Sequence, residues 1–434
     1  MKFFSTNHQS PAVSLREAVF RGLPPDNGLY MPERVPTLSA EFFNSIENLT
    51  LPEIAFEVTH ALLGEDVPAT DLRQIIQQAL TFEAPVVEIE PGVYVLELFH
   101  GPSMAFKDFG ARFMAGLMAY FLTQEQKEIH ILVATSGDTG GAVAQGFFGT
   151  PGIRVTILYP TGKVSAIQEK QLTTLGGNVT ALEVDGTFDD CQRLVKQAFL
   201  DADLSARFNL SSANSINIAR LIPQTFYYFG AYAQLKKLDR PLVFSIPSGN
   251  FGNLSAGILA RRMGLPIKQF IAATNLNHAV PDYLKTGKYS PQPSVETISN
   301  AMDVGSPSNF VRMKLLSGVA WRQVRSLVTG DFYDDTQTRQ AMKLVYEATG
   351  YVMCPHTAVA YLALKNYLQT VDEPVTGVFL ATAHPAKFLN VVEEAIGIPL
   401  PLPGRLAALL DKEKAAHPMT SRFEEFKAYL LAEV

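Results

Sequence analysis

The spacing of apolar residues changes at about residue 90 of the chain. Before this point, apolar residues recur at helical spacing, as in LPEIAFEVTHALLG from Leu51 and DLRQIIQQALTF from Asp71, which predicts amphipathic helices. Thr70 precedes the second segment and is a candidate N-cap. Later, short β-rich runs alternate with longer apolar segments, which is typical of βαβ units in a parallel sheet. The sequence therefore predicts a helical N-terminal domain over residues 1–90, followed by an α/β body.

Seven runs of the body are predicted to be strands of a largely parallel, doubly wound architecture. They span residues 93–99, 129–135, 153–160, 178–184, 241–248, 267–275 and 376–383. The segments between them, such as FGARFMAGLMAYFL from Phe109 and AIQEKQLTTLG from Ala166, have the length and spacing of helices. FEEFKAYLLAEV, which begins at Phe423, predicts a last amphipathic helix.

Composition narrows the class of protein. The chain has 434 residues, of which 47% are hydrophobic, and this is enough for two or three domains with substantial cores. Charged residues make up 18% and the formal net charge is -6, so no basic field favours nucleic acid. The N-terminus turns polar after Phe4, and no apolar run of about 18 residues follows, so we expect neither a targeting segment nor a membrane span. We expect small-molecule partners.

Cysteine and histidine give no sign of a metal or a disulfide. Cys191 and Cys354 lie far apart and outside any CxxC pattern, which favours a reduced, cytoplasmic compartment. The eight histidines show no HExxH spacing, and His100, His356 and His384 are as readily structural as functional. We expect no metal site.

Two glycine-rich loops directly follow predicted strands. The run 129–135 continues into SGDTGG, and the run 241–248 continues into GNFGN, each before a predicted helix. Ligands of open α/β sheets bind at the carboxyl ends of strands, and glycine lets the backbone and the next helix N-terminus approach an anion. Residues 248–253 are therefore a candidate phosphate loop, and residues 135–139 a candidate loop for a carboxylate or phosphate. The alternative is that these glycines only make tight turns, because neither loop matches a Walker or GxGxxG motif.

One lysine stands in apolar surroundings, in SMAFKDFG. Lys107 comes just before the apolar helix that starts at Phe109, where the helix dipole and burial both lower the pKa of an amine and leave it a nucleophile. The alternative is a structural lysine that reaches water or pairs with Asp108. A lysine able to form a Schiff base, together with a separate phosphate loop, is what pyridoxal phosphate requires.

Six motifs spread along the chain carry a family resemblance. They are NGLYMPE from Asn27, ELFHGPSMAFKD from Glu97, ATSGDTGGA from Ala134, SSANSINIARLIPQ from Ser211, SGNFGN from Ser248 and LATAHPAKF from Leu380. With these motifs the chain resembles the threonine synthase family, in its longer form with an extra N-terminal helical domain. The resemblance implies the tryptophan synthase β-like fold (fold type II) of pyridoxal phosphate enzymes, with two parallel-sheet α/β domains.

The resemblance also implies how the chain is divided. Residues 91–110 and 225–400 would form a large domain that binds pyridoxal phosphate, and residues 111–224 a small, mobile domain that binds substrate. Residues 401–434 would form a C-terminal helical extension.

The resemblance assigns residues to the cofactor. Lys107 would be the catalytic Schiff-base lysine, and Thr382 would face the pyridine nitrogen, although β-propensity alone accounts for a threonine at the end of a strand. Asp138 would contact the 3′ oxygen of the cofactor, where relatives have an asparagine. The cofactor phosphate would be bound by Ser248, Gly249, Asn250, Phe251, Gly252 and Asn253.

A phosphorylated substrate brings a second anion. The resemblance assigns the substrate carboxylate to Thr135, Ser136, Gly137 and Thr139. Asn217 and Arg220 are three positions apart, on one face of a predicted helix, and are candidates for the substrate phosphate. The alternative for Arg220 is a structural ion pair. Further candidates are Lys163 with Ser165, then Ser103 and Asn309.

The function implied is the last step of threonine biosynthesis. O-phospho-L-homoserine and water would give L-threonine and phosphate by γ-elimination and then β-hydration, with Lys107 moving protons. The rivals are a related phospho-lyase or a threonine dehydratase giving 2-oxobutyrate, and a silent cofactor-binding or sensor protein. Arg220 and Lys163 speak against the dehydratase, because threonine has no phosphate. We expect a cytoplasmic monomer or weak homodimer that binds neither nucleic acid nor membrane.

Overall fold

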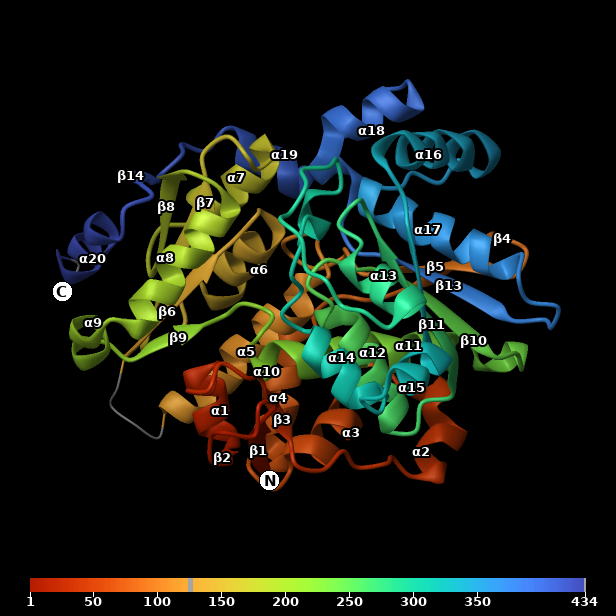
Figure 1. Ribbon diagram of the computed structural model, residues 1–434, viewed down its shortest axis with the longest axis horizontal. Helices are drawn as coiled ribbons and strands as arrows, with labels where there is room; N and C mark the ends of the chain where they lie inside the picture. The colour runs from red at the N-terminus through yellow and green to blue at the C-terminus, as the bar shows by residue number, and fades with distance from the viewer. Residues whose placement is uncertain (124–127, 433–434) are drawn as a thin grey trace.

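Two parallel sheets form the framework of the molecule, shown in a computed structural model that describes residues 1–123 and 128–432. The six-stranded sheet has the order β12-β11-β10-β13-β5-β4, and the five-stranded sheet the order β14-β8-β7-β6-β9. They lie at the centres of two bodies that stand side by side in Figure 1. Within these two sheets all pairings are parallel except that of β4 with β5, so the predicted α/β class is confirmed.

All seven predicted strands are present and differ from the predicted runs only at their ends. They are β5 (Val93–Glu97), β6 (Ile129–Ala134), β7 (Ile153–Pro160), β8 (Val179–Asp185), β10 (Leu242–Pro247), β11 (Ile267–Thr274) and β13 (Thr376–Ala381). Most of their residues are buried, because helices cover both faces of a parallel sheet. Continuous apolar runs between glycine-rich turns are therefore the signal that identified them.

Other strands escaped prediction because they are short or lie at sheet edges. They are β4 (Val86–Glu90), β9 (Leu210–Ser212), β12 (Val328–Phe332), β14 (His417–Thr420) and a small antiparallel sheet of β1 (Lys2–Ser5), β2 (Val13–Ser14) and β3 (Tyr30–Pro32). The N-terminal region is therefore not purely helical. β4 lies inside the predicted range 1–90 but pairs with β5 in the six-stranded sheet.

The N-terminal helices are α1 (Leu15–Arg21), α2 (Ala40–Ser45), α3 (Leu51–Leu63) and α4 (Ala69–Ala79). At the start of α3, the Glu53 carboxylate accepts hydrogen bonds from the amide and hydroxyl of Thr50, both 2.7 Å long. The predicted cap of α4 is wrong, because this helix starts one residue before Thr70 and follows Pro68. The φ of proline already suits helix entry, so the helix begins there.

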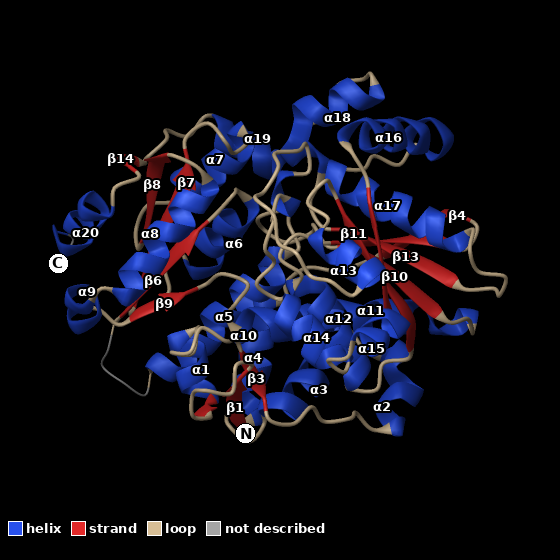
Figure 2. Ribbon diagram, viewed as in Figure 1, coloured by secondary structure: helices blue, strands red, loops and turns tan. Residues whose placement is uncertain are grey.

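Most of the remaining helices pack around the two sheets, as Figure 2 shows. They are α5 (Lys107–Leu122), α6 (Asp138–Phe147), α7 (Ala166–Thr173), α8 (Phe188–Leu200), α9 (Ala202–Arg207), α10 (Ile218–Leu221), α11 (Phe226–Leu235), α12 (Gly252–Arg262), α13 (Ala279–Thr286), α14 (Phe310–Ser317), α15 (Trp321–Leu327), α16 (Asp335–Thr349), α17 (Pro355–Leu368), α18 (Leu389–Ile396), α19 (Gly404–Leu410) and α20 (Phe423–Ala432).

Side chains alternate between the faces of each sheet, so one strand contributes to two cores. In β10, Val243 joins the cluster formed with α16, α17 and α18, whereas its neighbour Phe244 joins the main core. In β6, Leu132 faces α8 and α20, whereas Val133 joins the main core. That core extends through both bodies and into the N-terminal helices.

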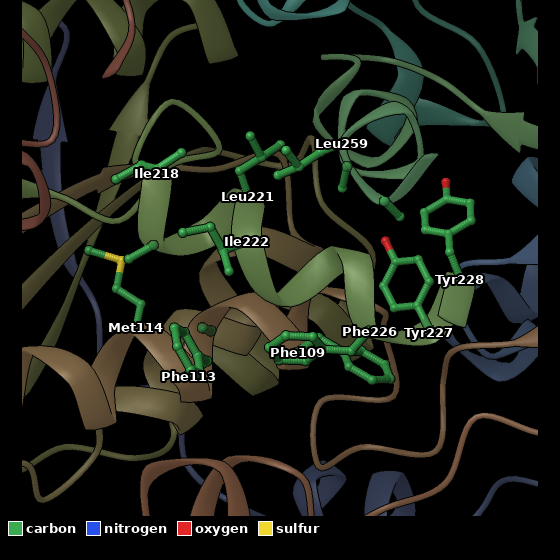
Figure 3. Packing of buried hydrophobic residues seen from close by; sticks show 14 of the residues in the cluster. Phe109, Phe113, Met114, Ile218, Leu221, Ile222, Phe226, Tyr227, Tyr228 and Leu259 are labelled. Atoms are coloured by element: carbon green, nitrogen blue, oxygen red, sulfur yellow. The ribbon is translucent and has the colours of Figure 1, made fainter. Parts of the chain in front are cut away.

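Helix α5 lies at the junction of the two bodies and is buried along most of its length. Its side chains Phe109, Phe113 and Met114 face Ile218, Leu221, Ile222 and Phe226 in Figure 3. The ring centroids of Phe109 and Tyr227 lie 5.0 Å apart, and those of Phe113 and Phe226 lie 5.9 Å apart. A helix that is apolar on most faces is held by packing on all sides, so its first residue, Lys107, has a fixed place.

The C-terminal segment returns to the five-stranded sheet. β14 pairs with β8, and α20 packs against α8 (Figure 1). The predicted last helix is present as α20, although residues 433–434 of that prediction lie outside the described residues. The predicted C-terminal helical extension also contains a strand, β14. Within residues 1–123 and 128–432, no helix has the length and hydropathy needed to cross a membrane.

Candidate active site

A cavity of about 260 Å³ opens between the two bodies, at the carboxyl ends of strands from both sheets. Its lining includes Lys107, Thr135, Ser136, Thr139, Arg220, Thr382 and the whole loop from Ser248 to Asn253. The structure thus brings most of the predicted site residues to one cavity. Gly137, Asp138, Lys163, Asn217, Ser103 and Asn309 are not part of the lining.

The loop between β6 and α6 is shaped by a threonine and a glycine. The hydroxyl of Thr135 accepts hydrogen bonds from the amides of Gly137 and Gly140, at 3.0 and 2.8 Å. Gly137 has a φ of 128°, and a Cβ there would lie 2.5 Å from the side chain of Gln168. Gly137 is therefore a structural requirement of the turn, and Ser136 and Thr139 remain to face the cavity.

The loop between β10 and α12 has the geometry of an anion site. A Cβ on Gly249 would lie 2.6 Å from the carbonyl oxygen of Ala301, so only glycine fits this close approach. Phe251 adopts a left-handed φ of 61°, a conformation that non-glycine residues adopt at a cost and that clusters at functional sites. The first amides of α12 have no acceptor within the helix and give its N-terminus a partial positive charge.

Side chains of the same loop brace it from behind. Asn250 donates to the Ser215 hydroxyl at 2.6 Å and accepts from the Ser308 amide at 2.6 Å. The side-chain oxygen of Asn253 accepts from the hydroxyls of Tyr227 and Tyr228, both at 2.7 Å. The loop is therefore held in shape by bonds to three other segments.

Lys107 begins α5 and borders the cavity. Its Nζ donates to the Thr139 hydroxyl at 2.7 Å. The pKa of Lys107 is lowered to about 8, chiefly by burial; the charges of Arg220 and Lys387 also lower it, and the charge of Asp138 opposes them. A fraction of the amine is therefore in its neutral, nucleophilic form at physiological pH, far more than for an ordinary lysine.

The pairing of Lys107 with its neighbour Asp108 is not observed. Asp108 accepts a hydrogen bond from the amide of Ser103 at 2.9 Å and so closes the loop before the helix. Gly101 makes room for it, because a Cβ there would lie 2.4 Å from the Asp108 carboxylate. Burial raises the pKa of Asp108 to about 6.

The carboxylate of Asp138, which is predicted to contact the cofactor, is paired with two side chains of the fold. One oxygen lies 2.6 Å from the Nζ of Lys387 and accepts from the amide of Gln168 at 3.0 Å. Burial alone would raise the pKa of Asp138, but the charges of Lys387 and Lys107 lower it to about 2. Lys387 is fully buried. Sequence reasoning missed it, although apolar residues flank it in AHPAKF much as they flank Lys107.

Asn217 and Arg220, the predicted pair of ligands for the substrate phosphate, have different surroundings. Asn217 is the N-cap of α10: it accepts from the amide of Ala219 and donates to the carbonyls of Val19 and Ser212. Asn217 therefore lies just before the first turn of the helix that carries Arg220. The amide of Asn217 is used within the fold.

Arg220 is buried and lines the cavity. It donates to the carbonyl of Ala213, and its Nε has no partner among the described residues. Burial lowers the pKa of Arg220 to about 10, so it is still a cation at neutral pH. Among residues 1–123 and 128–432 no carboxylate lies within ion-pair distance of it, which contradicts the ion-pair alternative.

The other predicted phosphate ligands have structural partners. Lys163 is half-exposed and pairs with Glu296 at 2.8 Å. Ser165 caps α7, and Asn309 accepts from Arg312 at 2.9 Å. Ser103 is the exception: its carbonyl accepts from Gln171 and Lys387, but its buried hydroxyl has no partner among the described residues.

One wall of the cavity was not foreseen. It comes from residues 292–294 and 301–308, a region that carries only one short 3-10 helix. The Asp303 carboxylate holds this wall by accepting from the side chains of Asn275 and Thr297, both at 2.8 Å. The apolar residues of this segment show neither helical nor strand periodicity, so this wall could not be predicted from the sequence pattern.

His356 also lines the cavity, but it is set up as a neutral group. Its Nε2 accepts from the amide of Ala301 at 3.2 Å, and burial lowers its pKa to about 4. Lys107 is therefore better placed than His356 to exchange protons in the cavity. Among the described residues no cluster of three or more potential metal ligands occurs.

Three family models cover the chain almost end to end. "Threonine synthase N terminus" spans residues 2–80, "Pyridoxal-phosphate dependent enzyme" residues 74–382, and "Threonine synthase, C-terminal" residues 357–430. The chain belongs to the threonine synthase family. It is 45% identical to the threonine synthase of Haemophilus influenzae over 99% of this chain and 100% of that protein.

Solved threonine synthase structures share the fold throughout. The Escherichia coli structure aligns with a TM-score of 0.94 at 43% identity and covers 100% of both chains. A threonine synthase of Brucella melitensis, solved with pyridoxal phosphate bound, aligns with a TM-score of 0.93 at 34% identity over 99% of this chain and 98% of that one. The family resemblance, the fold type and the dependence on pyridoxal phosphate are thereby confirmed.

We expect Asp138→Asn to lower the pKa of Lys107. The charge of Asp138 favours the ammonium form, and an unpaired Lys387 would disfavour it, so both effects act in one direction. The rate at which apo-protein takes up pyridoxal phosphate, followed by visible absorbance, should have its midpoint near pH 8 in wild type and at lower pH in the variant.

Asp108→Asn is the matched control, because that carboxylate faces Ser103. Its midpoint should stay with the wild type. A midpoint that moves in this control and not in Asp138→Asn would contradict the assigned charge environment of Lys107.

Proposed function

We propose that the cavity converts O-phospho-L-homoserine and water to L-threonine and phosphate, with pyridoxal phosphate bound between Lys107 and the loop from Ser248 to Asn253. The observation that carries the proposal is Arg220, a buried cation without a carboxylate partner in the described chain, in the same cavity as that loop. Two anion sites in one cavity suit a phosphorylated cofactor together with a phosphorylated substrate.

The residues present fit the cofactor. The amine of Lys107 suits its aldehyde, the amides of the 248–253 loop suit its phosphate, and the hydroxyl of Thr382 suits its pyridine nitrogen. The carbonyl of Thr382 accepts from the amide of Phe106 at 2.8 Å, which ties the two sides of this site together. When bound, the cofactor supplies an electron sink for the bonds at Cα of an amino acid.

The side chains that line the cavity would each take a separate role in the reaction. Lys107, in its neutral form, removes the proton at Cα and returns protons to the carbon skeleton, while Thr139 orients its amine. Ser136, Thr139 and nearby amides bind the substrate carboxylate. Arg220 binds the phosphate as substrate and stabilises it as the leaving group.

Closure of the smaller body would protect the hydration step. We infer that residues 111–224, which carry Ser136, Thr139 and Arg220, move toward the body that carries the 248–253 loop and exclude stray water. Controlled access of water is what separates threonine from 2-oxobutyrate as product.

The setting of the enzyme is also inferred. The net charge of -6 and the two buried thiols support a cytoplasmic enzyme that binds small molecules and not nucleic acid. We infer a monomer or weak homodimer.

A product assay tests the function directly. Purified protein with pyridoxal phosphate and O-phospho-L-homoserine should release threonine and phosphate in equal amounts, and Lys107→Ala should release neither. Phosphate with 2-oxobutyrate and no threonine would mean a phospho-lyase. Formation of 2-oxobutyrate from threonine alone would mean a dehydratase.

Arg220→Ala should weaken binding of the phosphorylated substrate. Loss of a charge-assisted contact predicts a rise in KM of about 10-fold to 100-fold, with the visible absorbance of bound cofactor retained. Lys163→Ala is the control and should change KM little, because its pair with Glu296 is exposed. Loss of the cofactor band in Arg220→Ala would instead assign Arg220 to the cofactor or the fold.

A further inference from the structure

A second buried arginine stands just outside the cavity lining. Arg312 of α14 is fully buried, and its guanidinium donates only to carbonyl-type oxygens. The acceptors are the backbone oxygens of Ser215, Ile216 and Tyr30 and the side-chain oxygen of Asn309, at 3.2, 2.8, 2.9 and 2.9 Å. Within residues 1–123 and 128–432 it has no carboxylate at ion-pair distance.

A cation buried in this way is costly to the fold. Carbonyl dipoles replace part of its hydration, but a desolvation penalty remains, as for other buried cations without a paired anion. Burial lowers the pKa of Arg312 to about 9, which still leaves it charged at neutral pH. An apolar side chain of similar volume would fill the space without that cost. We therefore expect a buried charge at this position to have an anion nearby.

The partners of Arg312 form the back of the 248–253 loop. The Ser215 hydroxyl accepts from Asn250 at 2.6 Å and from Asn309 at 3.4 Å. A Cβ on Gly252 would lie 3.5 Å from Asn309 and 3.6 Å from Ser215. One layer of side chains therefore separates the guanidinium from the loop.

We propose that Arg312 is the positioning residue and buried counter-charge of the anion bound by the 248–253 loop, and so makes this site select phosphorylated ligands. The inference rests on the proposed placement of the cofactor phosphate. Arg312 holds Ser215 and Asn309, which brace Asn250 and pack on Gly252. Its charge acts through a medium of low dielectric, where the attraction to a dianion is strong.

The test compares pyridoxal phosphate with pyridoxal, which lacks the phosphate. Dissociation constants for both are measured by spectroscopic titration of the apo forms of wild type, Arg312→Gln and Arg312→Lys. Arg312→Gln keeps hydrogen-bond donors and removes the charge, so its affinity for pyridoxal phosphate should fall on the order of tenfold while its affinity for pyridoxal stays the same. Arg312→Lys keeps the charge and should keep most of the preference for the phosphorylated form.

Arg262→Gln is the matched control. Arg262, on α12, donates to the carbonyl of Leu316 at 2.8 Å and so also links α12 to α14, but at the far end of α12 from the loop. Its preference for pyridoxal phosphate should equal that of wild type.

Three outcomes separate the possibilities. An equal loss of both affinities in Arg312→Gln would mean that Arg312 acts only through the fold, and the proposal would be wrong. If Arg312→Gln does not fold, loss of the phosphate preference in folded Arg312→Lys would overturn the role of the charge. Wild type that binds both ligands equally would instead overturn the placement of the cofactor phosphate.

Discussion

The structure depends on one constraint: the amine of Lys107 is held where its surroundings disfavour its positive charge. Lys107 is held there because α5 is packed on most of its faces, and its end therefore does not move to reach water. The Phe109 ring packs against Tyr227, and the hydroxyl of Tyr227 in turn braces Asn253 of the opposite loop. The packing of the apolar core therefore also fixes the geometry of the cavity.

The second constraint is an excess of buried positive charge. Lys107, Lys387, Arg220 and Arg312 are all held within or just behind the cavity wall, and Asp138 neutralises Lys387 alone by direct contact. Buried cations are stable only beside anions or strong dipoles. A cofactor phosphate and a substrate phosphate would supply those anions, so the same charges that make the apo-protein costly make the liganded form stable.

The sequence was sufficient for what depends on local pattern. Buried parallel strands are continuous apolar runs, so β6 and β10 and the glycine loops after them were predicted, whereas β4, β12 and β14 lie at sheet edges and carry no such run. Lys107 was predicted from its apolar neighbours taken together with the separate phosphate loop at residues 248–253. Asn217 was misplaced because a cap and a first helical turn look alike in sequence, and the pairing of Asp138 with Lys387 joins segments that only the folded chain brings together. The cavity wall braced by Asp303 could not be predicted, because its apolar residues follow no helical or strand period.

The central claim is that Lys107 is the lysine that binds the cofactor. Reduction of the protein with borohydride in the presence of pyridoxal phosphate, followed by digestion and peptide mass spectrometry, tests this most directly. The account predicts a single pyridoxyl label, on the peptide that contains Lys107. A label on Lys387, the fully buried lysine that pairs with Asp138, or on a surface lysine with Lys107 unmodified, would contradict it.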